Sequence, residues 1–80
     1  MSIKEWNILF FIKYNGTSHT FKSKLSEKIK TIKNKVKEKL KIHYICNNYL
    51  ILNYWGKFLN DNLELIDYGV QNGSTIEVFN

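Results

Sequence analysis

The sequence predicts a small α+β domain in which a mixed sheet of ββαββ order packs against one main helix. Residues 6–24 form two β-favouring segments around an Asn-Gly pair, and residues 27–39 space their apolar side chains by three and four. Residues 50–79 return to strand-like patterns that are separated by turns. Because 80 residues lie near the lower limit for one unaided core, we expect a single domain over 1–80, either complete or cut from a longer chain.

The first two segments predict a β-hairpin. Residues 8–12, Ile-Leu-Phe-Phe-Ile, favour a strand over Trp6–Tyr14. The Asn-Gly pair at 15–16 tolerates the positive φ angles of a two-residue type I′ turn. The return strand, residues 17–24, is mostly polar and is therefore expected at the edge of the sheet.

The central segment predicts one amphipathic helix over Glu27–Lys39, with Ser26 as its N-cap. One apolar stripe should face the sheet, and it consists of Ile29, Ile32, Val36 and Leu40. In the connection that follows, we expect Ile42 and Ile45 to pack inward and Cys46 to be a small core residue.

The last third predicts the remaining elements. They are a strand at 50–55, a very short strand near Phe58, a single-turn helix at 65–68 and a closing strand at 74–79. In the closing strand, Ile76 and Val78 share one face. We expect the first and last strands to be parallel and central.

No catalytic constellation is visible. The single cysteine, Cys46, excludes an internal disulfide, and with His43 it supplies at most two ligands of a metal site. We therefore expect no enzyme activity, no cofactor and no metal. No stretch approaches the roughly 20 apolar residues of a membrane span, so we expect no membrane partner and an intracellular, cytoplasmic or nuclear monomer.

The charge is unevenly placed. Residues 22–41 hold nine lysines against two glutamates, whereas residues 42–80 are net acidic; the whole chain carries +5 and has no arginine. A lysine-rich helix could follow a phosphate backbone, so RNA binding is an alternative function. Its candidate residues are Lys30, Lys33, Lys35 and Lys37. Against it, no stacking aromatics are interleaved with these lysines.

Several residues of the last third resemble the ubiquitin family. They are Gly56, Lys57, Leu59, Asp61, Leu65, Asp67, Tyr68 and Val70, followed by the Ser-Thr-Ile-Glu-Val-Phe strand. The resemblance covers about residues 7–79 and implies the ubiquitin-like β-grasp fold. It also implies that the Tyr68 hydroxyl hydrogen-bonds to nearby backbone. Shorter segments are similar to the ubiquitin-like domain of the splicing factor 3a large subunit and to other spliceosomal ubiquitin-like proteins.

Two functional features of ubiquitin itself are changed. The family's Gly-Gly tail does not follow the last strand, which is succeeded only by Asn80; a modifier whose tail is missing from this sequence remains an alternative. The family's apolar partner patch aligns with Asn53, Glu77 and Phe79. Proteins that recognise that patch are therefore expected to bind this chain poorly.

Alternation along the strands predicts where a protein partner would bind. If Leu9 and Phe11 face the helix, then Ile8, Phe10 and Ile12 face outward. They would lie next to outward residues of the third and fifth strands. A one-residue shift would exchange the two faces. The expected partner-binding face consists of Phe10, Ile12, Ile51, Asn53 and Phe79.

Overall fold

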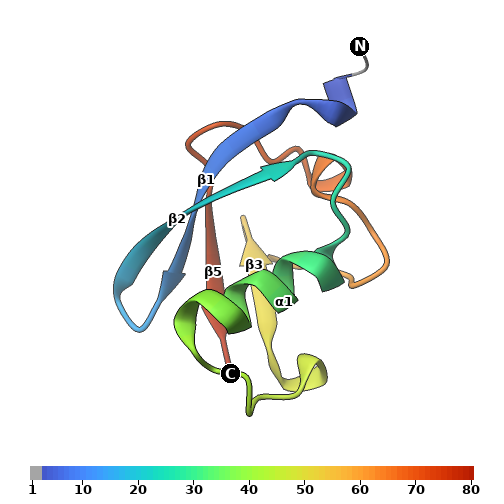
Figure 1. Cartoon of the computed structure of the whole chain (residues 1–80). Helices are drawn as coiled ribbons and strands as arrows, with labels where there is room; N and C mark the ends of the chain where they lie inside the picture. Colours follow the sequence, from blue (N-terminus) through green and yellow to red (C-terminus); the bar gives the residue numbers. More distant parts are fainter. Residues whose placement is uncertain (1–2) are drawn as a thin grey trace.

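The computed structural model describes residues 3–80, so the first two residues of the expected 1–80 domain lie outside it. Its sheet has five strands in the order β2-β1-β5-β3-β4 (Figure 1). The elements are η1 (Ile3–Glu5), β1 (Asn7–Tyr14), β2 (Thr17–Lys24), α1 (Ile29–Leu40), η2 (Asn47–Tyr49), β3 (Ile51–Tyr54), β4 (Lys57–Phe58), η3 (Leu65–Tyr68) and β5 (Thr75–Phe79).

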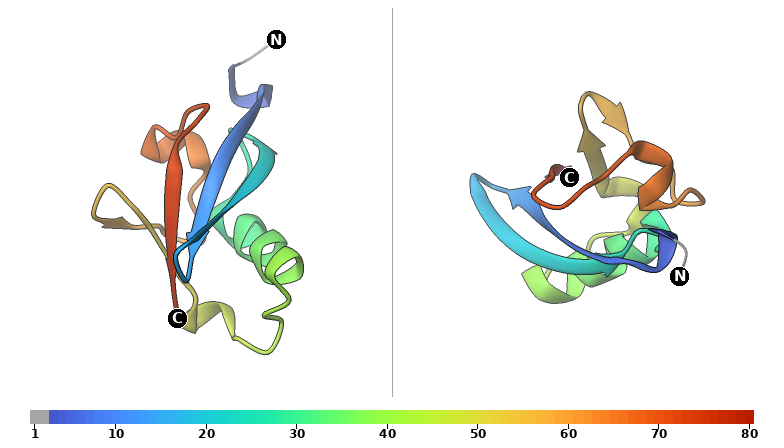
Figure 2. Two further views of the ribbon diagram at one scale, coloured as in Figure 1. Left: turned by 90° about the vertical axis from the view of Figure 1, so that its left-hand side faces the viewer. Right: turned by 90° about the horizontal axis from the view of Figure 1, so that it is seen from above.

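The two central strands are the first and the last, as the sequence predicts. β1 and β5 pair in parallel, with Phe11 beside Thr75 and Lys13 beside Glu77, while β2 and β3 flank them in antiparallel orientation. Figure 2 shows α1 lying on one side of these central strands. The other side of the sheet is called the outer face below.

Asn15 and Gly16 form the predicted hairpin turn. Their φ angles are 50° and 80°, which are the left-handed values that a type I′ turn requires at both central positions. Tyr14 consequently faces Thr17, and the register runs without interruption to Asn7 opposite Lys24.

α1 begins two residues later than predicted, and Ser26 is not its N-cap. The Ser26 amide donates to the Lys4 carbonyl, which keeps Ser26 in the turn that follows β2. Lys28 occupies the N-cap position without a side-chain hydrogen bond. The first helical amides, of Ile29 and Lys30, instead donate to carbonyls of the 61–63 segment, so tertiary contacts satisfy donors that a capping side chain would otherwise meet.

The core lies between α1 and the sheet. Ile29, Ile32 and Val36 are fully buried from the helix, as predicted, whereas Leu40 is only partly buried. Ile42 and Ile45 also pack inward, and this confirms the sequence prediction for the connection. Cys46 is exposed, so its prediction as a core residue was wrong; Ile45 takes the inward position, and Cys46 serves as the N-cap of η2.

Tyr68 has the backbone role that the resemblance implies. Its hydroxyl oxygen accepts a hydrogen bond of 2.8 Å from the Asn60 amide. The bond connects the end of η3 to the bend after β4, and the single-turn helix itself lies where it was predicted. Within residues 3–80, none of the helices has the length and apolar character needed to cross a bilayer.

Candidate partner-binding face

The predicted orientation of β1 was wrong. Phe10 and Ile12 are fully buried and belong to the core, whereas Leu9 is 52% exposed. The reason is visible at the ends of the strand, where Asn7 and Lys13 lie on the same face as Leu9. Turning that face toward the helix would bury an amide and an ammonium group without partners, which costs far more than exposing a leucine. Phe10 and Ile12 therefore cannot contact a partner in the folded chain.

The other three predicted residues lie on the outer face, where a partner could reach them. Ile51 on β3 is 38% exposed and lies directly opposite Phe79 on β5, which is 47% exposed. Asn53 lies on the same side, opposite Glu77. Leu9 and the partly exposed Phe11 replace the two buried residues of β1.

The outer face thus has two apolar groups separated by a polar row. Leu9 and Phe11 form one group on β1, and Ile51 with Phe79 forms the other on β3 and β5. Between them, the strand registers align three polar side chains, which are Lys13, Glu77 and Asn53. Asn53 is partly buried, and its Oδ1 atom is shielded from solvent without a hydrogen-bond donor.

Sequence reasoning missed the aromatic hairpin at the edge of this face. Trp55 is 86% exposed in the turn between β3 and β4, and Phe58 is 72% exposed on β4. Phe58 pairs directly with Asn53, so its side chain lies on the outer face. The two-residue spacing of Tyr54 and Lys57 around Trp-Gly was the available signal, because it is the spacing of a tight hairpin.

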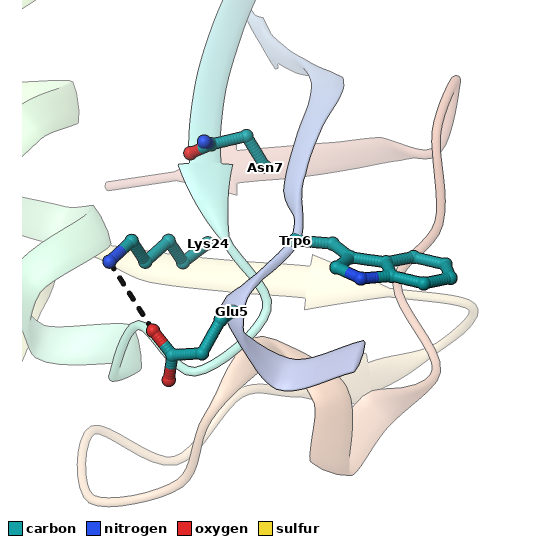
Figure 3. A pocket seen from close by; sticks show the side chains of 4 residues that line it. All are labelled: Glu5, Trp6, Asn7 and Lys24. Atoms are coloured by element: carbon teal, nitrogen blue, oxygen red, sulfur yellow. Dashed lines mark hydrogen bonds and ion pairs between the residues drawn. The ribbon is translucent and has the colours of Figure 1, made fainter. Parts of the chain in front are cut away.

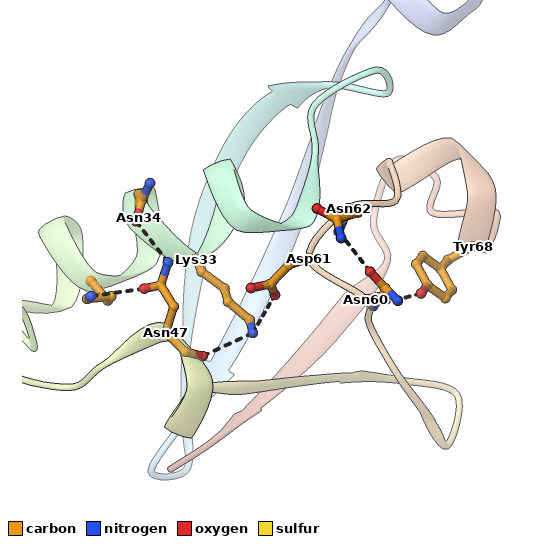
Figure 4. Close-up of polar contacts among 8 residues, drawn as sticks. Lys33, Asn34, Asn47, Asn60, Asp61, Asn62 and Tyr68 are labelled. Atoms are coloured by element: carbon orange, nitrogen blue, oxygen red, sulfur yellow. Dashed lines mark hydrogen bonds and ion pairs between the residues drawn. The ribbon is translucent and has the colours of Figure 1, made fainter.

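Lys33 is buried, although it was a candidate for binding RNA. It is 6% exposed, and its Nζ lies 2.6 Å from Asp61 Oδ1 and 3.2 Å from the Asn47 carbonyl oxygen. Figure 4 shows Lys33 extending between Asn47 and Asp61. The side chain therefore links α1 to two distant loops and cannot reach a phosphate.

Two of the other candidate lysines also have partners within the chain. Lys35 Nζ lies 3.3 Å from Glu27 Oε1, and Lys37 Nζ donates to Asn47 Oδ1 at 2.9 Å. Within residues 3–80, Lys30 alone among the four candidates is exposed without such a side-chain contact. The structure therefore does not bring the four lysines together as a free cationic surface.

The described residues offer no evident metal centre. Within residues 3–80, no group of three or more His, Cys, Asp or Glu side chains is arranged to hold a metal ion. A cavity of about 330 Å³ opens instead at the edge of the outer face, beside Trp55 and Glu77. A second cavity, of about 640 Å³, lies at the other end of β1, beside Trp6.

Comparison with known proteins agrees with this architecture. The family model described as the Ubiquitin family matches residues 10–79, which is most of the chain. No curated protein matches the sequence, and the narrower resemblance to the splicing factor 3a large subunit gains no support. The mixed five-strand sheet and the one α-helix of residues 3–80 agree with the family match. The chain belongs to the ubiquitin family.

Proposed function

We propose that this ubiquitin-like domain is a non-enzymatic protein-interaction module that docks a partner polypeptide through its outer face. The observation that supports this most directly is the exposure of Ile51 and Phe79, which lie directly opposite each other on β3 and β5. Apolar side chains gathered in this way are unusual on a surface that contacts only water, and they are typical of the centre of a protein interface.

The arrangement of the face also describes the partner. A docked segment places apolar side chains against both groups and hydrogen-bonding groups over the polar row between them. Asn53 has an unpaired side-chain oxygen in that row, and a donor group of the partner would satisfy it. A partner that binds this face is expected to differ from one that recognises the apolar patch of ubiquitin, because the corresponding positions here hold Asn53 and Glu77.

Photo-crosslinking tests the proposal. A benzoylphenylalanine at position 51 is expected to capture a discrete protein from an extract of cells that express the chain. The same probe at position 30, on exposed α1, is the matched control and should not capture that protein. Ile51→Ala and Phe79→Ala are each expected to abolish capture by a probe at position 9, while amide NMR spectra show that both variants remain folded. If capture survives both substitutions, the outer face is not the docking surface.

The same experiment separates protein docking from RNA binding. Docking through the outer face predicts weak dependence on salt and no effect of ribonuclease. RNA binding predicts loss of the captured complex on ribonuclease treatment and a steep fall in affinity as salt rises. Lys30→Glu reverses the charge of the exposed candidate lysine without breaking a side-chain contact described above, so it should leave protein capture unchanged.

A further inference from the structure

Trp55 occupies a position that neither packing nor turn geometry explains. It is 86% exposed, and its φ angle of 53° lies in the left-handed region, which costs a residue with a Cβ about 1 kcal/mol or more. The other tight hairpin of the chain fills the equivalent position with Asn15, at φ 50°, and asparagine tolerates this conformation. A bulky, solvent-exposed aromatic residue in a strained backbone conformation suggests a binding role.

The Trp55 ring is also held in place from one side. Tyr54 meets it edge-on, with ring centroids 6.3 Å apart and planes at 79°. The Tyr54 hydroxyl is in turn 2.9 Å from Ser74 Oγ, which anchors Tyr54 to the turn before β5. The indole is therefore supported by a fixed neighbour while its other surface remains open.

The cavity beside this ring combines an aromatic surface with a carboxylate. It measures about 330 Å³ and is lined by Lys13, Trp55, Gly56, Thr75 and Glu77. Extending the pairing of β3 with β5 by two residues places Trp55 beside Thr75, and Glu77 is the next residue on the same face of β5. Within the described residues, neither Glu77 nor Lys13 takes part in an ion pair.

The cavity at the other end of β1 provides an internal comparison. It is lined by Glu5, Trp6, Asn7 and Lys24, so it too contains a tryptophan and a glutamate. There, however, Glu5 Oε2 lies 3.3 Å from Lys24 Nζ, and Figure 3 shows the Trp6 indole pointing away from that ion pair. The carboxylate beside Trp6 already forms an ion pair, whereas Glu77 beside Trp55 forms none within the described residues, although Lys13 is its neighbour on β1.

We propose that the Trp55 cavity receives an arginine side chain of the polypeptide that docks on the outer face. The guanidinium stacks on the open surface of the indole and donates to the Glu77 carboxylate. Arginine suits this site better than lysine, because its planar group stacks on aromatic rings and binds carboxylates through two donors. The inference rests on the proposed function, and it adds a specificity element at the edge of the docking surface.

The cavity is lined by one cation, Lys13, and one anion, Glu77, so the indole of Trp55 decides which ligand charge it prefers. An anionic ligand would bind Lys13, meet repulsion from Glu77 and face the electron-rich surface of the indole. A cationic ligand gains from the carboxylate and the indole and is opposed only by Lys13. The two ligand classes therefore predict opposite effects when the two charged residues are neutralised.

Titration of the intact chain with arginine amide, followed by NMR, tests the site. The indole N–H signals of the two tryptophans are assigned with Trp6→Phe. The Trp55 signal is expected to shift saturably at millimolar arginine amide, and the Trp6 signal should stay unchanged. Citrulline amide, which has a similar shape without the charge, should produce no saturable shift.

Three variants test the site, and two of them show which ligand charge it prefers. Glu77→Gln should weaken binding of arginine amide about two- to fivefold, and Lys13→Gln should strengthen it by a similar factor, as expected for exposed charge pairs. Trp55→Asn, which suits the turn, should abolish the interaction. The proposal is overturned if inorganic phosphate binds instead and responds to the two charge variants in the opposite sense. Equal binding of lysine amide or citrulline amide would also overturn it.

Failure of the arginine site can be told apart from failure of the proposed docking function. If capture depends on Ile51 and Phe79 but arginine amide does not bind, the docking face stands and the arginine site is wrong. If arginine amide binds and no partner is captured through those residues, the cavity is real and the proposed function fails.

Discussion

The buried ion pair between Lys33 and Asp61 yields the sharpest prediction about stability. Asp61→Asn preserves the shape of the side chain and the backbone carbonyl that accepts from Lys30, but it removes the charge opposite Lys33. The ammonium group then faces only neutral acceptors, which are the Asn47 carbonyl and the amide oxygen of the new side chain. We expect this substitution to destabilise the fold.

The magnitude follows from the burial of the two groups. Breaking a buried ion pair by removing one partner costs about 3–5 kcal/mol, because an uncompensated charge stays behind. The Lys33 side chain is 8% exposed but that of Asp61 is 35% exposed, so water replaces part of the lost interaction. We therefore expect Asp61→Asn to cost about 2 kcal/mol. Lys33→Met fills the same space with apolar atoms and leaves only the partly solvated carboxylate, so it should cost about 1 kcal/mol or less.

A double-mutant cycle provides the measurement. Urea unfolding followed by far-ultraviolet circular dichroism gives the free energy of unfolding for the parent chain, both single variants and Lys33→Met/Asp61→Asn. The double variant contains no buried cation, so it should be no less stable than Asp61→Asn, and the coupling should be at least as large as the cost of Lys33→Met alone. If the two single effects simply add, or if Asp61→Asn costs less than about 0.5 kcal/mol, the reasoning about the buried charge is refuted.

Three further predictions concern the two faces of the sheet and the loop after β4. Phe10→Ala should lower the free energy of unfolding by about 3–5 kcal/mol, because Phe10 belongs to the core. Leu9→Ala should lower it by about 0.5 kcal/mol or less, because Leu9 is exposed. A larger effect of Leu9→Ala than of Phe10→Ala in urea unfolding would contradict the orientation of β1. Asn53→Leu should stabilise the chain by about 1 kcal/mol, since it removes an unpaired, shielded oxygen, and a lowered melting temperature would count against this account. Tyr68→Phe should cost about 1 kcal/mol and accelerate hydrogen exchange at the Asn60 amide, whose acceptor is lost. Unchanged exchange at Asn60 would show that the hydroxyl does not hold this loop.

Most of the fold could be read from local patterns. The Asn-Gly pair predicted the first hairpin, and the apolar stripe from Ile29 to Val36 predicted which side of the helix packs against the sheet. The orientation of β1 could not be taken from its centre, because five consecutive apolar residues show no alternation. The polar residues Asn7 and Lys13 at its ends carried the missing information, since residues two apart share a face.

The sequence indicates that Lys33 is buried, but it does not identify the partner of its charge. It lies four residues after Ile29 and one after Ile32, so it occupies a position of the buried stripe, and a lysine there requires a partner. The identity of that partner depends on how the 61–63 segment passes over the start of α1, which is a tertiary contact. The same holds for Trp55, because no local pattern places Glu77 beside it.

The pairing of the first strand with the last also governs when this chain can fold during synthesis. Leu9 is joined to Asn72 by a hydrogen bond across 63 positions, and its carbonyl accepts from Gly73. Until that distant segment leaves the ribosome, β1 and β3 have no strand between them, and both present unpaired edges. Helix α1 and the first hairpin can form early, but the sheet closes only with β5, so contacts distant in sequence should set the folding rate. The native sheet can therefore form only after β5 has emerged from the ribosome.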